Sequence, residues 1–143
     1  MSVYPNPTIS SSPLKRFKYR PTASAIFGNV RRPLVSLDLY SPVKKQWVPV
    51  TDLLADTGAD LSILPRAIGE LLLGDIRRGQ ALTIRGIVPG ALLKAYLHRL
   101  SCKFNGRPFR LLVAIAESED VTAVLGRVEG LDRLTAAFLK GRE

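Results

Sequence analysis

The sequence contains one cysteine and one histidine, and each scarcity excludes a class of protein. The single cysteine, Cys102, excludes an internal disulfide bond and favours a reducing compartment, so we expect a cytoplasmic protein. The single histidine, His98, excludes a metal centre built from several histidines, and we expect neither a metal nor another cofactor. The longest apolar run, 111–116, is far shorter than the ~20 residues of a membrane-spanning helix, so we expect no membrane contact.

Acidic residues are absent from residues 1–33, which carry six of the 21 lysines and arginines. These six account for +6 of the formal net charge of +9 and leave +3 for residues 34–143. Residues 1–24 are also rich in serine, proline and threonine, a composition that favours a mobile segment. We therefore predict a flexible basic N-terminal arm over 1–33 and one folded domain over 34–143.

The basic arm has two interpretations. Residues 14–20 interleave phenylalanine and tyrosine with lysine and arginine, which is a weak form of the pattern found in nucleic-acid-binding segments. A run of basic residues near a chain end is also commonly a solvated tail. Binding of nucleic acid through residues 14–32 therefore stays open beside the simpler interpretation of a solvated arm.

The rest of the chain predicts a mainly β domain. Apolar runs and alternating patterns predict strands over 34–40, 47–54, 61–64, 81–85, 91–100 with a continuation over 102–104, 108–116 and 123–126. Pro49 is expected to make its strand irregular because it lacks a backbone N–H, and Asn105-Gly106 predicts a tight hairpin turn. Short helices are expected over 65–73 and around 128–134. This many short strands favours a closed or partly closed barrel.

A turn with two acidic residues, Asp56 and Asp60, stands between two apolar runs near the middle of the chain. Leu53-Leu54-Ala55 leads into Asp56-Thr57-Gly58-Ala59-Asp60, and Leu61-Ser62-Ile63-Leu64 follows. Buried carboxylates are rare because removing a charge from water is costly. Asp56 is therefore interpreted as either a structural ion or a catalytic acid.

A second stretch, Ala123-Val124-Leu125-Gly126-Arg127, lies 70 residues downstream, counted from Asp56 to Gly126. Together the two stretches resemble the signatures of retropepsin-like aspartic proteases, the single-domain group that includes the retroviral proteases. The resemblance covers roughly residues 34–139 and implies a closed barrel of short strands with a flap hairpin and one or two short helices. It places the flap tip at 86–90, where Pro89 and a smaller number of glycines depart from a typical retroviral flap.

The chain has a single Asp-Thr-Gly triplet, whereas this chemistry needs two acids. Two carboxylates at hydrogen-bonding distance share one proton, so that one activates a water molecule while the other donates to the scissile carbonyl. Asp52 and Asp60 are too close to Asp56 in sequence to face it. We therefore expect a homodimeric endopeptidase in which each copy contributes Asp56 and the substrate is an extended peptide or protein.

The resemblance also implies roles for the neighbours of the catalytic Asp56. Thr57 and Gly58 would support the active-site loop, and Asp60 would form a structural ion pair with Arg127. The expected substrate-binding residues are Ala59, Asp60, Gly86, Ile87, Val88, Pro89 and Gly90. Candidates for the apolar walls of the substrate pocket are Leu53, Ile84, Ile87, Val88 and Leu125. All five also suit the core, and for Leu53 and Leu125 the core is at least as good an interpretation.

Two other functions stay open at this point. A retropepsin-like fold is compatible with a non-catalytic binding or dimerisation module, although an intact Asp56-Thr57-Gly58 argues against it. The charge of the arm is compatible with a basic nucleic-acid-associated protein.

Overall fold

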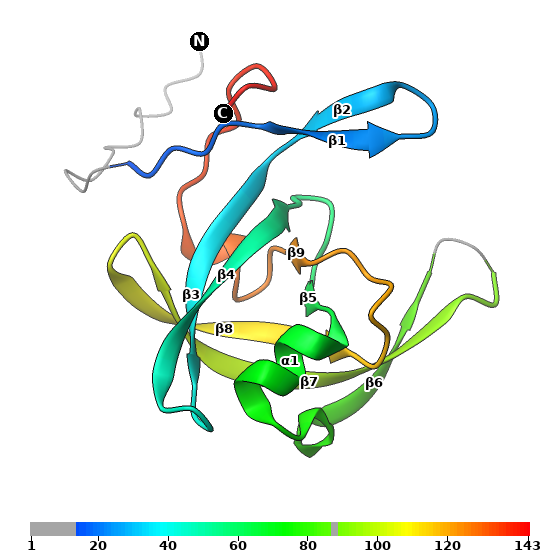
Figure 1. Cartoon of the computed structure of the whole chain (residues 1–143), viewed down its shortest axis with the longest axis vertical. Helices are drawn as coiled ribbons and strands as arrows, with labels where there is room; N and C mark the ends of the chain where they lie inside the picture. Colours follow the sequence, from blue (N-terminus) through cyan, green and yellow to red (C-terminus); the bar gives the residue numbers. More distant parts are fainter. Residues whose placement is uncertain (1–13, 87–88) are drawn as a thin grey trace, which may run out of the picture.

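The computed structural model describes residues 14–86 and 89–143, and its centre is a closed ring of six strands (Figure 1). The main sheet contains β3 (Leu34–Ser41), β4 (Gln46–Ala55), β5 (Ser62–Leu64), β6 (Gln80–Arg85), β7 (Leu92–Phe104), β8 (Arg107–Ala116) and β9 (Val124–Leu125). Its strand order is β3-β4-β9-β5-β8-β7-β6, and a further pairing of β3 with β7 closes the ring and leaves β6 outside it. The predicted mainly β closed barrel of short strands is confirmed.

The core fills the inside of this ring. Its most deeply buried large side chains come from five elements and include Leu39, Leu64, Leu72, Ile115 and Leu125. The β7–β8 hairpin supplies the longest ladder, and its turn is the predicted Asn105-Gly106 pair, with φ of 50° and 76°. Two successive residues at positive φ match the right-handed twist of the flanking strands, which is why this dipeptide favours a hairpin.

A single α-helix among the described residues, α1 (Arg66–Leu73), covers one side of the barrel. Gly74 ends it at φ 72°, where its N–H donates to Glu70 O. A Cβ at Gly69 would overlap the Ile115 side chain, so the missing side chain lets the helix lie close to β8. Ser41 Oγ adds a buried hydrogen bond to Leu72 O at 2.7 Å, which fastens the end of the helix to β3. No described helix has the length and apolar content needed to cross a membrane.

Strand β4 is irregular, but not at the residue that the sequence indicated. Pro49 stays in register with Asp38, and the ladder shifts between the pairs Leu37–Val50 and Val35–Leu53. The extra residue falls next to Asp52, which adopts φ 62°. On the edge of β4 that faces away from β3, strand β9 pairs only with Leu54 and Ala55. Pro49 is tolerated because this edge needs no backbone N–H donor at its position.

Two other expectations differ from the structure. Residues 20–32, for which the sequence predicted no strand, form a hairpin of β1 (Arg20–Ser24) and β2 (Gly28–Arg32). The second helix is only a 3-10 turn, Leu131–Arg133, because Glu129 at φ 47° interrupts any longer helix. A second 3-10 turn, Ile76–Arg78, follows α1.

Candidate active site

Asp56 lies where β4 ends and the chain turns back toward β5. Its side chain is half-buried, and its Oδ1 accepts a hydrogen bond from Gly58 N at 2.9 Å. Its backbone N–H donates to Leu125 O at 3.1 Å, and its carbonyl accepts from Ala59 N at 3.3 Å. The carboxylate is therefore held by the backbone of its own loop and by the neighbouring strand β9.

Strand β9 is threaded between the two strands that flank the Asp56 loop. Val124 pairs with Leu54 in a parallel ladder and with Ile63 in an antiparallel one. Beyond β9, Arg127 N donates to Ala59 O and Val128 N donates to Asp60 O, each at 2.9 Å. The loop is thus fixed at both ends and along its length by a segment that lies about 70 residues further along the chain.

Gly126 fits against the back of the loop because it has no side chain. A Cβ there would lie 2.5 Å from the carbonyl carbon of Leu61, 2.6 Å from Leu61 O and 3.0 Å from Ala59 O. Its N–H donates to the hydroxyl of Ser62, which is 1% exposed, at 2.9 Å. The requirement for glycine is steric, since Gly126 does not adopt a left-handed φ.

The expected ion pair between Asp60 and Arg127 is not formed among the described residues. Arg127 Nε instead lies 3.4 Å from Asp132 Oδ1, in the 3-10 turn that follows. Asp60 is exposed and meets this segment only through its backbone carbonyl. The backbone bonds already join the two segments, and the turn brings Asp132 nearer to the guanidinium than Asp60.

The loop offers polar groups to a second molecule. Thr57, Gly58 and Asp60 are exposed, whereas Ala59 is half-buried. Together with Asp56, they form the turn between β4 and β5. The flap hairpin projects from β6 and β7 on the same side as the tip of the β1–β2 hairpin (Figure 1).

The flap position is consistent with its predicted place between two strands. Arg85 pairs with Leu92, and Gly86 N donates to Ala91 O at 2.9 Å. Three of the five predicted flap residues, Gly86, Pro89 and Gly90, are described and exposed. The other two, Ile87 and Val88, lie outside the described residues.

The candidates for the walls of the substrate pocket differ in how deeply their side chains are buried. Leu53 is 2% exposed and Leu125 is 1% exposed, so both side chains belong to the core. Ile84 on β6 is half-buried and stays a candidate for contact with substrate. Two surface cavities of about 370 and 490 Å³ lie at the base of the N-terminal segment, and neither is lined by Asp56.

Cys102 is a structural thiol and not a competing nucleophile. Its side chain is fully buried on β7, and burial, assisted by the charge of Asp38, raises the pKa of the thiol to about 12. His98 lies in the same strand with Nε2 2.7 Å from Ile76 O. Among the described residues, no three His, Cys, Asp or Glu side chains are grouped as metal ligands would be.

Comparison with solved structures gives the fold. The chain resembles a retropepsin-like aspartic protease from Rickettsia conorii with a TM-score of 0.53, at 17% identity over 88% of this chain and 95% of that one. It also resembles EIAV protease in complex with the inhibitor HBY-793, with a TM-score of 0.48, at 23% identity over 76% of this chain and 92% of that one. No protein-family model matches the sequence, and no curated protein does. The likeness to the Rickettsia conorii structure shows a retropepsin-like fold.

Proposed function

We propose that the protein is a homodimeric aspartic endopeptidase with one Asp56 from each copy at its active site. The observation that carries this proposal is the position of Asp56: a half-buried carboxylate at the end of β4, oriented by Gly58 N and fixed from behind by β9. A structural acid would be expected to pair with a cation. Among the described residues, Asp56 has no such ion pair.

The mechanism follows from bringing two such carboxylates together on a two-fold axis. Two like charges at hydrogen-bonding distance retain one proton between them. The ionised Asp56 takes a proton from a bound water molecule, which attacks the scissile carbonyl, while the protonated Asp56 donates to the carbonyl oxygen. Thr57, exposed beside Asp56, supports the pair from across the axis.

The substrate in this proposal is an extended peptide between the Asp56 loop and the flap. The exposed residues of both elements provide backbone groups for strand-like hydrogen bonds, and Asp60 provides a polar contact. Ile84 supplies apolar surface at the root of the flap. We assign this activity to residues 34–143, and the single buried thiol of Cys102 supports a cytoplasmic setting.

The activity is expected to follow the fraction of dimer. When the protein is diluted below the dissociation constant of the dimer, halving its concentration should lower the rate about fourfold, because the dimer concentration varies with the square of the monomer concentration. Hydrolysis of an unfolded protein substrate and sedimentation equilibrium should be measured over the same concentrations. A fully active monomer in sedimentation would contradict the shared active site.

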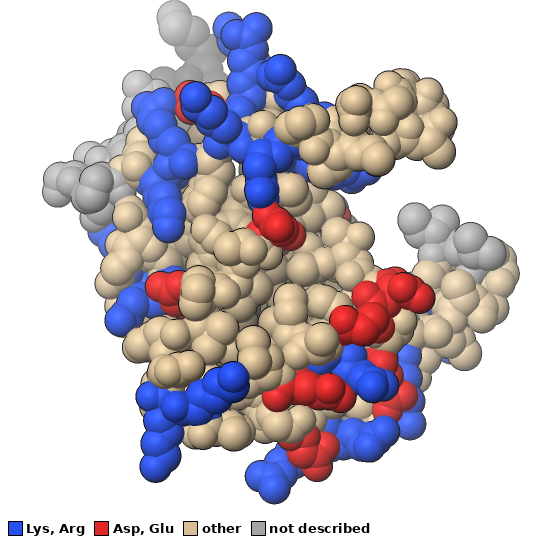
Figure 2. All heavy atoms as spheres, viewed as in Figure 1, with Lys and Arg blue, Asp and Glu red and all other residues tan. Residues whose placement is uncertain are grey.

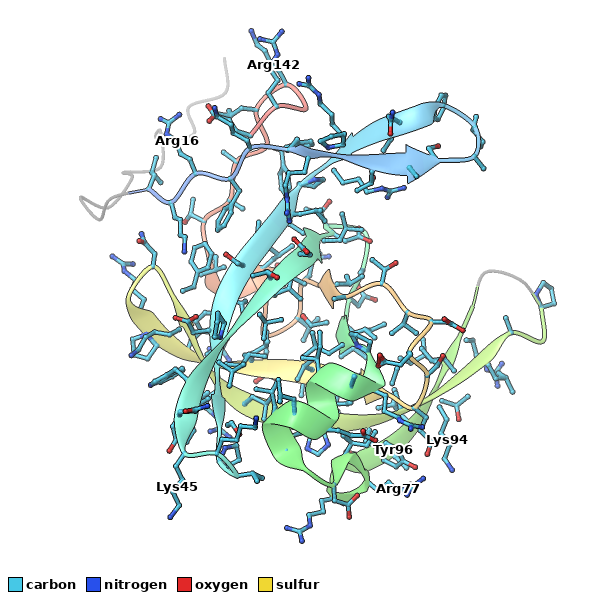
Figure 3. The ribbon with its side chains drawn as sticks, in the orientation of Figure 1. Arg16, Lys45, Arg77, Lys94, Tyr96 and Arg142 are labelled. Atoms are coloured by element: carbon cyan, nitrogen blue, oxygen red, sulfur yellow. The ribbon has the colours of Figure 1, made fainter. Side chains whose placement is uncertain are left out.

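A second candidate function is binding of a polyanion at the end of the molecule that holds the C-terminus. Figure 2 shows Lys and Arg side chains gathered over this end, and Figure 3 places Arg16 and Arg142 there. The cavity of about 490 Å³ at this end is lined by Lys18, Arg31 and Arg142, with Glu143 as its one acid. The non-catalytic alternative, a dimerisation module, has no specific observation in its favour.

Removal of these three positive charges should weaken polyanion binding. In the triple variant Lys18→Ala/Arg31→Ala/Arg142→Ala, the slope of log affinity against log salt for a single-stranded oligonucleotide should fall by about 2, since each lost phosphate contact accounts for roughly 0.7. Fluorescence anisotropy at several salt concentrations measures this slope. Lys44→Ala/Lys45→Ala/Arg78→Ala serves as the control for net charge. Equal slopes in both variants would eliminate the second candidate.

A further inference from the structure

The β1–β2 hairpin stands apart from the barrel. Within the described part of the chain, its strands pair only with each other, in a five-residue antiparallel ladder from Arg20–Arg32 to Ser24–Gly28. Its attachments to the rest of the protein are at its root, where Arg20 pairs with Asp52 and Pro33 O accepts from Ala55 N at 2.9 Å. Figure 1 shows the hairpin extending away from the barrel as a separate two-stranded arm.

The tip of this arm is apolar and exposed. Ile26 is 84% exposed and Phe27 is 72% exposed, the two highest values among the exposed large hydrophobic residues of the described chain. The turn itself is ordered by hydrogen bonds from Phe27 N to Ser24 Oγ and from Asn29 N to Phe27 O. An isolated two-stranded hairpin is marginally stable in water, so this arm needs another surface to pack against.

The root of the arm lies beside the candidate active site. Pro33, which follows β2, is hydrogen-bonded to Ala55, the residue before Asp56. A five-residue strand is roughly 17 Å long. If two Asp56 side chains meet at hydrogen-bonding distance, an arm of this length that starts next to Asp56 is long enough to reach beyond the axis.

The direction of the arm indicates which surface it reaches. Its tip projects on the same side of the molecule as the flap, and a flap must extend toward the axis to cover a shared substrate (Figure 1). Val128, whose N–H donates to Asp60 O, is 46% exposed and adds an apolar side chain next to the active-site loop. An uncharged tip of two large side chains suits a protein surface better than a polyanion.

We propose that the β1–β2 hairpin is a dimerisation arm, with Ile26 and Phe27 packed against a second copy of this chain beside the paired Asp56 loops. This inference rests on the proposed two-fold dimer and adds to it the element that holds the two copies together. In a symmetric dimer each arm contacts the other copy, so that every change in the tip acts twice.

A charge at the tip should therefore break the dimer. Phe27→Asp, made in the Asp56→Asn chain to prevent proteolysis, should raise the dimer dissociation constant by about 100-fold or more, because two large apolar contacts are lost at once. Sedimentation equilibrium measures the constant. The matched control is Val43→Asp, which changes a residue 61% exposed in the β3–β4 turn, near Lys45 at the opposite end of the molecule (Figure 3). A Phe27→Asp constant equal to that of the control would overturn the proposal.

A second measurement does not depend on a destabilising charge. In Ile26→Cys, the new thiol is the one accessible to a maleimide, since Cys102 is fully buried. Its rate of alkylation should fall several-fold as the protein concentration rises through the dimer transition. A rate that is independent of dimer fraction would show that the tip stays in solvent and would overturn the proposal.

These results separate the arm from the enzymatic activity. A dimer that depends on Phe27 but has no peptidase activity supports the arm and contradicts the proposed function. An active peptidase whose dimer dissociation constant is unchanged by Phe27→Asp supports the proposed function and contradicts the arm. A chain that stays monomeric at all concentrations contradicts the arm.

Discussion

Replacing Asp56 with asparagine is expected to lower peptidase activity at least about 1,000-fold and to leave the dimer intact. Asparagine keeps the shape of the side chain and can still accept the hydrogen bond from Gly58 N, but it cannot exchange a proton with water or substrate. Hydrolysis of an unfolded protein substrate measures the loss, and sedimentation reports the oligomeric state. Full activity in the variant would refute the aspartic protease mechanism.

Two controls make this experiment specific. Asp120→Asn removes an exposed carboxylate from the loop after β8 and should leave the activity unchanged. An equal mixture of wild-type and Asp56→Asn chains, allowed to exchange subunits, should lose about half of the wild-type activity, because random pairing places half of the wild-type chains in inactive mixed dimers. An unchanged rate after exchange would mean that each copy works alone.

Gly126→Ala is expected to lower the free energy of unfolding by roughly 3 kcal/mol. The added Cβ would meet the backbone of Leu61 and Ala59, which cannot rotate away as a side chain would. Relief requires β9 to separate from the Asp56 loop, so activity should fall along with stability. Urea denaturation of wild type and variant measures the difference.

Gly58→Ala is the matched control for this glycine. A Cβ at Gly58 would lie 3.2 Å from Asp56 Oδ1, a side-chain atom that can move by a few tenths of an ångström. We expect a loss of stability below about 1 kcal/mol there. Equal stabilities for Gly126→Ala and wild type would show that the loop is not held from behind as described.

The barrel could be predicted from the sequence because its signals are local. Strands 34–41 and 92–104 carry clear apolar patterns, and Asn105-Gly106 has backbone preferences that specify its turn. The Asp56 loop was recognisable because the triplet lies between two apolar runs. Where the pattern and the local turn chemistry agreed, the predicted elements lie within one or two residues of the observed ones.

The misses arise where the outcome depends on three-dimensional context. The β1–β2 hairpin has the sequence Arg-Pro-Thr-Ala-Ser in its first strand, with neither alternation nor β-branched runs to indicate it. The partner of Arg127 depends on a turn that brings Asp132 near, which spacing alone does not reveal. The irregularity of β4 lies at Asp52 and not at Pro49. The edge of β4 that faces away from β3 has no partner strand at Pro49, so the missing N–H of proline requires no bulge there.

The position of β9 between β4 and β5 has a consequence for folding during synthesis. The two-residue strand comes late in the chain, yet it must enter a gap between two segments synthesised some 70 residues earlier. Contacts this distant in sequence form slowly because a long loop must close first. A nascent chain released only as far as α1 therefore contains Asp56 but lacks the later segment whose backbone hydrogen bonds fix the Asp56 loop.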